Sequence, residues 1–292
     1  FLELYEPLHG WWGRYTDTVR CEITGLPEDC VRRDYPAEGG GNPGLDPEDG
    51  ESWFTGLIWQ PRSLPGLEFQ LDFWRFDHEG RIEWLNGQSV LDEGGSLGIV
   101  REPDEPDGTP GRIVLVQESY VNIDKLVTRG FDTTVRYRWT TVRAGNFRIS
   151  LMHTYLDEWK LTETANDVML NWNVAGDKLH IPVPRNRANL NLVWDRGAHA
   201  ATANIHYTGH YYNDENVWVD GMPTDQRMKI SDHATLDLQY SHTFESLRNA
   251  TLRIGCNNVI DEDPPFHYWP SNEPMHDGRG RFWYLRWRQP IR

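Results

Sequence analysis

Alternation between apolar and polar side chains governs the C-terminal part of the chain and constrains its fold more than any other feature. Residues 234–244, 251–259 and 281–288 each place apolar side chains at every second position. The positions between them are polar and include charged residues such as Asp237 and Arg253. A period of two residues is that of a β-strand. Strands with one apolar face and one charged face are what a membrane β-barrel with a water-filled interior requires.

Segments with the same alternation recur from residue 52 onward, and their connections are alternately short and long. Outer-membrane barrels are built in this way, with short turns on the periplasmic side and long loops outside the cell. The predicted strands are residues 52–60, 67–76, 113–139 with a break near 122–124, 147–159, 187–194, 199–212, 234–244, 251–259 and 281–288. We expect irregular segments over residues 1–50, 77–111, 160–186 and 213–231.

The resulting fold class is all-β, a partial antiparallel transmembrane barrel. An odd number of strands does not close a bacterial single-chain barrel. We therefore expect the C-terminal portion of a larger barrel, with residues 1–50 as an extracellular loop region and residues 51–292 as barrel strands.

Composition limits the other classes of function. The chain has 292 residues and a formal net charge of −15, which argues against nucleic-acid binding because phosphate contacts need a basic surface. No run approaches the roughly 18–20 apolar residues of a transmembrane helix, so a helical membrane protein is excluded.

A soluble, Trp-rich β-sandwich that binds carbohydrate, or a glycosidase on such a fold, is the alternative. A glycosidase needs two carboxylates held about 5–10 Å apart, and no pair of acids stands out in the sequence. No His-Glu-x-x-His motif occurs. We expect no enzymatic activity, no cofactor and no metal site.

The three cysteines fall into two environments. Cys21 and Cys30 lie in one polar segment, and their spacing suits a small disulfide loop in an oxidising compartment. Cys256 lies on the apolar face of a predicted strand, where a free cysteine packs as a small hydrophobic residue.

Six segments, in order along the chain, resemble motifs of the TonB-dependent outer-membrane receptors. They are residues 1–7 (FLELYEP), 41–48 (GNPGLDPE), 120–132 (YVNIDKLVTRGFD), 184–187 (PRNR), 257–266 (NNVIDEDPPF) and 278–282 (GRGRF). The third is similar to the family's Asn…Gly-Phe/Leu-Asp strand, and the fifth to its Asn-Leu-Phe-Asp-Lys-Asp-Pro-Pro motif. One departure is the C-terminus, which ends in Gln289-Pro290-Ile291-Arg292 where family barrels usually end in an aromatic residue.

The resemblance implies a 22-stranded, plugged barrel, of which this chain supplies about nine C-terminal strands, without the plug, the TonB box and the N-terminal strands. It implies a location in the bacterial outer membrane and uptake of a scarce solute of the siderophore, cobalamin or oligosaccharide class. The implied partners are outer-membrane lipid, the plug domain, TonB–ExbB–ExbD through the N-terminal part, and the ligand.

Two groups of residues are candidates for function. The first group consists of polar strand residues expected to face the lumen: Asp132, Arg136, Arg138, Arg148, Arg253 and Arg286. The second group consists of loop aromatics that could stack on a ligand: Trp11, Trp12, Trp172, Tyr211, Trp218 and Trp269. His206 and His210 are four residues apart on one predicted strand, which we interpret as a coincidence because no third metal ligand is fixed nearby.

Overall fold

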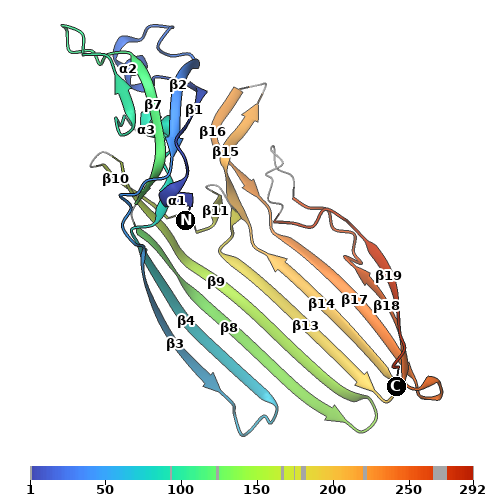
Figure 1. Ribbon diagram of the computed structural model, residues 1–292. Coiled ribbons are helices and arrows are strands. Elements are labelled where there is room, and N and C mark those ends of the chain that lie inside the picture. Colours follow the sequence, from blue (N-terminus) through green and yellow to red (C-terminus); the bar gives the residue numbers. More distant parts are fainter. Residues whose placement is uncertain are drawn as a thin grey trace. The chain divides into compact units, whose positions relative to one another are not determined.

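The computed structural model describes residues 2–92, 94–122, 125–165, 168–173, 175–178, 182–219, 222–265 and 275–291. The chain divides into two compact units. The first comprises Phe1–Glu51, Phe76–Val127 and Lys160–Trp172, and the second comprises Ser52–Arg75, Thr128–Trp159 and Asn173–Arg292. Strands make up most of the regular structure (Figure 1). The predicted all-β fold class is therefore confirmed.

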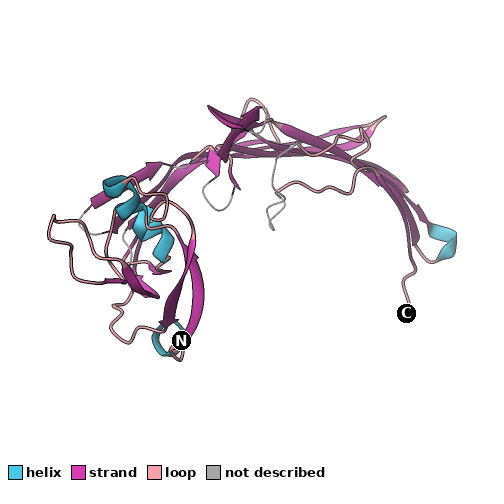
Figure 2. Cartoon of the chain, turned by 90° about the horizontal axis from the view of Figure 1, so that it is seen from above, coloured by secondary structure: helices cyan, strands magenta, loops and turns pink. Residues whose placement is uncertain are grey.

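One long sheet has the strand order β19-β18-β17-β14-β13-β9-β8-β4-β3, and β10 (Val168–Asn173) pairs with β9 beside this path. The pairings from β9 to β19 are antiparallel, and Figure 2 shows that the sheet is curved. The strands are β3 (Asp49–Trp59), β4 (Leu67–Glu79), β8 (Lys125–Thr141), β9 (Gly145–Ala165), β13 (Asn186–Arg196), β14 (His199–Thr208), β17 (His233–Phe244), β18 (Ala250–Asn257) and β19 (Phe282–Arg288). The nine strands on this path correspond to the nine predicted ones.

The connections between these strands differ in length at the two ends of the sheet, as the sequence predicts. The short ones are residues 60–66, 142–144, 197–198 and 245–249. The long ones are residues 80–124, 166–185, 209–232 and 258–281. Gly197 in the tightest turn has a φ of +57°, which a glycine adopts without a steric penalty.

The alternation produces a continuous apolar face. Leu192, Ala203, Leu238, Cys256 and Trp283 lie opposite one another in turn across β13, β14, β17, β18 and β19. Leu238 and Trp283 remain 42 and 62 % exposed. A β-sandwich would cover such a face with a second sheet, so the uncovered face favours a barrel wall. Cys256 is free and buried, as predicted.

Aromatic rings cover glycines on the opposite, polar face. A Cβ atom on Gly255 would overlap the ring of Tyr284 on β19, and one on Gly130 would lie 2.7 Å from the ring of Trp74 on β4. The rings therefore occupy the space that the missing side chains leave, which is a known way to hold a curved sheet at a glycine.

The first unit has its own sheet, with the order β1-β2-β7-β5 and with β6 also paired to β7. Its elements are α1 (Leu2–Tyr5), β1 (His9–Tyr15), α2 (Thr18–Thr24), β2 (Arg33–Gly40), β5 (Ile82–Trp84), α3 (Gly87–Asp92), β6 (Ile99–Arg101) and β7 (Ile113–Asn122). Leu91 and Val116 lie fully buried in its hydrophobic core. Within the described residues, no helix has the length and apolar character needed to cross a membrane.

The prediction of irregular structure over residues 1–50 and 77–111 is therefore wrong. The reason is that β2 and β7 pair in parallel, with Ala37 opposite Val116, so the sheet joins segments far apart in the sequence. Neither segment buries its apolar side chains alone, and the sequence of each one alone does not reveal the partner. The break predicted near residues 122–124 separates β7, in this sheet, from β8, in the long sheet.

A third, small sheet lies in the second unit, with the order β12-β11-β15-β16. It consists of β11 (Asp177–Lys178), β12 (Pro182–Val183), β15 (Tyr211–Val219) and β16 (Met222–Ile230). The prediction of irregular structure over residues 160–186 and 213–231 is also wrong. Residues 213–231 belong mostly to the antiparallel hairpin of β15 and β16, and Asp177 on β11 pairs in parallel with Tyr212 on β15. The predicted strand 199–212 is also too long, because β14 ends at Thr208 and Tyr211 begins a strand of this other sheet.

Candidate functional site on the polar face

The polar face of the long sheet holds all six residues predicted to face a lumen. One row runs from Asp195 through Ala200 and Ser241 to Arg253 and Arg286. Arg148 lies in the neighbouring row, opposite Val193, and its Nη2 atom is 3.4 Å from a carboxylate oxygen of Asp195.

The remaining three of the six lie on β8. The hydroxyl of Thr154 donates to Asp132 at 2.6 Å, and Arg136 forms an ion pair with Glu68 at 2.6 Å. Arg138 follows Arg136 by two residues and so lies on the same face. That this face lines a lumen stays a prediction.

Arg253 and Arg286 face each other directly across β18 and β19. Like charges in this position repel each other. Among the described residues, none brings a carboxylate within ion-pair distance of either guanidinium. The two guanidinium groups therefore concentrate positive charge on this part of the polar face.

A cavity of about 370 Å³ opens on the same face, at the end of the sheet where the long connections begin. Its wall combines residues of β13, β14 and β17 with residues 275–280 of the long connection before β19. Three histidines line it: His206, His233 and His276. Sequence analysis missed His233, although it precedes Thr235 and Asp237 at the same spacing of two, which places it on the polar face.

Two of the histidines singled out in the sequence, His206 and His210, have polar partners in the structure. His206 contacts Asn189 at 2.7 Å and Asp237 at 3.4 Å. His210 lies beyond the end of β14 and contacts Asp232 at 3.5 Å, so the two histidines do not share a strand as the sequence predicted. In the described part of the chain, no group of three metal-ligating side chains comes together.

The loop aromatics lie in different environments. Trp12 on β1 is 71 % exposed, whereas Trp11 packs against the core of the first unit. Tyr211 is buried in a small core with Met228 and Ile230, so its ring is not exposed as expected. Trp172 and Trp218 lie on β10 and β15, and Trp269 lies outside the described residues. Their role in ligand binding stays a prediction.

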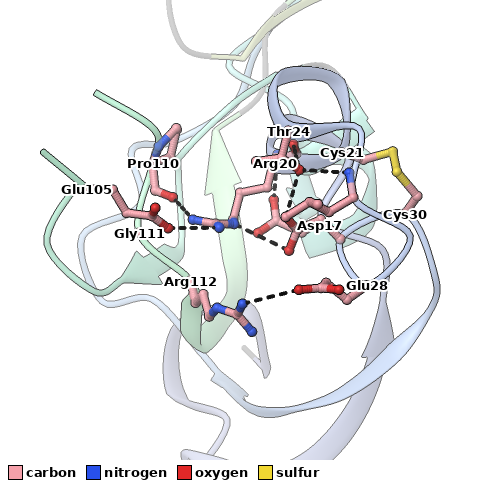
Figure 3. Close-up of polar contacts among 12 residues, drawn as sticks. Asp17, Arg20, Cys21, Thr24, Glu28, Cys30, Glu105, Pro110, Gly111 and Arg112 are labelled. Atoms are coloured by element: carbon pink, nitrogen blue, oxygen red, sulfur yellow. Dashed lines mark hydrogen bonds and ion pairs between the residues drawn. A yellow bond between two sulfur atoms is a disulfide. The ribbon is translucent and has the colours of Figure 1, made fainter. Parts of the chain in front are cut away.

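The first unit encloses a network of ion pairs beside a disulfide (Figure 3). Cys21 and Cys30 are bonded to each other. Arg20 is buried on α2 and contacts Asp29 at 3.4 Å, Glu105 at 3.0 Å and the carbonyl oxygen of Pro110. Burial raises the pKa of Asp29, but the hydrogen bond from Thr24 and the charge of Arg20 outweigh it, so this pKa lies below its ordinary value.

Two further acids of this unit are buried and paired. Arg101 donates to both carboxylate oxygens of Asp17, at 2.7 and 2.8 Å. Glu118 accepts from the Tyr15 hydroxyl at 3.1 Å, the Trp84 indole at 3.2 Å and the backbone N–H of Gly87 at 2.8 Å. Burial, and next the charge of Glu118, raise the pKa of Tyr15 to about 12. These buried acids act in folding, because their oxygens are already occupied by donors of the same unit.

Comparison with known families decides the identity. The model of a family described as "TonB dependent receptor-like, beta-barrel" matches residues 12–259. This chain belongs to that family. The long sheet is accordingly part of a TonB-dependent receptor barrel, and the family consists of receptors and transporters rather than enzymes. No curated protein matches the chain in sequence.

Solved structures of two bacterial receptors share the fold. The siderophore receptor PirA from Acinetobacter baumannii superposes with a TM-score of 0.59 at 16 % identity, over 98 % of this chain and 36 % of PirA. A mutant of the ferric enterobactin receptor PfeA from Pseudomonas aeruginosa gives a TM-score of 0.54 at 17 % identity, over 87 % of this chain and 32 % of PfeA. The chain thus spans about a third of the length of these receptors.

Proposed function

We propose that this chain forms part of the wall of an outer-membrane receptor that imports a scarce solute, with energy supplied through TonB. The observation that carries this proposal is the long sheet with one uncovered apolar face and one charged face. Outside a membrane, an apolar face of this extent is normally covered. In a barrel wall, lipid covers it while water fills the interior.

The apolar face is suited to lipid along its whole width. It carries a groove of about 680 Å³ between aromatic side chains, among them Trp139, Trp194 and Trp283, with Ala203 in its wall. Aromatic rings at the edges of an apolar band are typical of outer-membrane barrels. The polar face with its arginines would line the lumen and contact the plug domain.

A siderophore is the solute class that we propose. The support is that PirA and PfeA are a siderophore receptor and a ferric enterobactin receptor. Cobalamin and oligosaccharides remain the other classes that the sequence motifs allow. The folded first unit would form part of the extracellular surface over which the solute enters, and its exposed Trp12 could contact a flat chelate.

Uptake by the host provides the test. Cells that carry the gene and cells that lack it are grown under iron limitation with radiolabelled ferric enterobactin, ferric citrate or ferrichrome, each with intact and deleted tonB. We expect accumulation of at least one chelate that requires both genes, with the protein in the outer-membrane fraction. Uptake of labelled cobalamin or maltodextrin alone would replace the solute class. A protein found only in soluble fractions would contradict the proposal and favour the carbohydrate-binding β-sandwich.

A further inference from the structure

The cavity at the long-connection end of the polar face is built on a row of three residues. Arg187 on β13 lies opposite Thr208 on β14, and Thr208 lies opposite His233 on β17. Neighbouring strands are about 4.8 Å apart, so the backbones at Arg187 and His233 are about 10 Å apart, with Thr208 between them. All three residues line the cavity, and the alternation places their side chains on the same face. Paired strands hold them in place, as a preformed binding site requires.

His233 carries an unsatisfied polar atom. Its side chain is buried, with 8 % of the residue exposed, and its Nε2 atom has no hydrogen-bond partner among the described residues. The ring packs edge-on against that of His276, with the centroids 4.7 Å apart, which fixes its orientation. A buried polar atom without a partner is energetically unfavourable. A ligand that reached this atom from the cavity would remove this penalty.

The guanidinium of Arg187 is the free positive charge of the site. Within the described part of the chain it has neither an ion pair nor a side-chain hydrogen bond. The two carboxylates that line the cavity, in contrast, are already engaged. Asp237 accepts from the backbone N–H of Asn258 at 2.8 Å and lies 3.4 Å from His206, and Asp277 pairs with Arg279 at 2.5 Å.

Three of the groups that remain for a ligand are the guanidinium of Arg187, the hydroxyl of Thr208 and the imidazole of His233. Each can donate a hydrogen bond, and one is a permanent cation. Charge-assisted bonds from such donors select oxygen anions over neutral acceptors. We propose that this cavity binds an oxyanion, a carboxylate or a phosphate group, between Arg187 and His233. That the oxyanion belongs to the imported solute rests on the function proposed above.

Calorimetric titration of the receptor, purified from its host at its native length in detergent, tests the site without transport. Citrate and inorganic phosphate are the probes, and maltose is the neutral comparison. We expect citrate or phosphate to bind, and maltose not to bind. Arg187→Gln should weaken binding about tenfold or more, because it removes the charge-assisted bonds, and His233→Phe should weaken it about three- to tenfold. Arg143→Gln, in the short connection between β8 and β9 and outside the cavity, removes the same charge and should stay within about twofold.

Two measurements keep this test independent of folding and of transport. Thermal unfolding identifies a variant that has lost its structure, and Arg187→Lys, which keeps the charge, should recover part of the affinity. In the wild-type protein labelled with ¹⁵N-histidine, the ring signals of His233 should shift when the anion binds. Citrate binding without phosphate binding identifies a carboxylate site, and the reverse identifies a phosphate site.

Three results would overturn the proposal: no binding of either anion, equal binding by wild type, Arg187→Gln and His233→Phe, or binding of maltose alone. Because no step requires TonB, a receptor that fails in the uptake assay can still bind the anion. Failure of the proposed function and failure of this site are therefore distinguishable.

Discussion

Two neighbouring residues of β14 test which face of the sheet contacts lipid. Ala203 lies on the apolar face between Leu192 and Leu238, and Thr202 lies on the polar face between Val193 and Gln239. Both are near the middle of the strand, His199–Thr208. An arginine at either position adds the same side chain to the same strand, so the two variants differ in the face that receives the charge.

The losses of unfolding free energy that we expect for the two arginine variants differ several-fold. A lipid-facing arginine near the bilayer centre destabilises an outer-membrane barrel by about 2–4 kcal/mol. We therefore expect Ala203→Arg to lower the free energy of unfolding by about 2–4 kcal/mol, and Thr202→Arg to lower it by less than about 1 kcal/mol, because water solvates a charge on the polar face. Ala203→Leu controls for size and should stay within about 1 kcal/mol, because lipid is as apolar as leucine.

Equilibrium unfolding in urea, with the native-length receptor refolded into phosphatidylcholine vesicles and followed by tryptophan fluorescence, measures all three variants. Equal losses for the two arginine variants, or a larger loss for Thr202→Arg, would refute the assignment of the apolar face to lipid. If instead a second sheet packed on this face, Ala203→Leu would destabilise by about 1–3 kcal/mol through overpacking, and this outcome would support the sandwich.

Three further predictions concern stability. Gly255→Ala should destabilise the sheet by about 1–3 kcal/mol, because the new methyl group displaces the Tyr284 ring. Urea titration measures the free energy of unfolding, and an unchanged Tyr284 position with no loss of stability would contradict the prediction. Replacing Cys21 and Cys30 by serine should make the first unit less stable by about 2.5 kcal/mol. This is the free energy that corresponds to the entropy of closing a loop across a separation of 9 residues. Rapid proteolysis of residues 1–51 is the readout, and resistance equal to that of the wild type would count against the prediction. Because the pKa of Asp29 lies lower in the folded protein than in the unfolded chain, its stabilising effect is present above about pH 4 and disappears as the pH falls through the lower value. Asp29→Asn should therefore reduce the loss of unfolding free energy on acidification. An acid dependence identical to that of the wild type would argue against a stabilising role of Asp29.

The sequence predicts the strands of the long sheet well because the alternation that identifies each strand lies within that strand. Each strand carries its own alternation, and a wall between lipid and water requires the same pattern in every strand. Residues such as Leu238 and Asp237 therefore identify their faces without knowledge of their neighbours. The six polar residues were placed on one face by this rule, and the register agrees for Arg148, Arg253 and Arg286.

The fold of the first unit is not predicted because it depends on contacts between residues that are far apart in the sequence. Ala37 is buried by Val116, and the buried carboxylate of Glu118 is satisfied by Tyr15 and Trp84. No periodicity in residues 1–50 identifies the segment about eighty residues away that pairs with them. The same limit applies to the cavity: the alternation places His233 on the polar face, but only the register brings it beside Thr208 and Arg187.

Some charged residues of the two units differ in whether they have a partner, and this difference separates residues that stabilise the fold from candidates for binding. In the first unit the buried acids Asp17 and Glu118 accept hydrogen bonds from donors of the same unit, because a carboxylate that is removed from water is unfavourable unless it is paired. On the polar face of the long sheet, Arg187, Arg253 and Arg286 have no carboxylate partner among the described residues. Unpaired arginines in a chain with a net charge of −15 are not explained by folding alone. Substitution of the first unit's acids should therefore change unfolding, whereas substitution of these arginines should change the binding of anions.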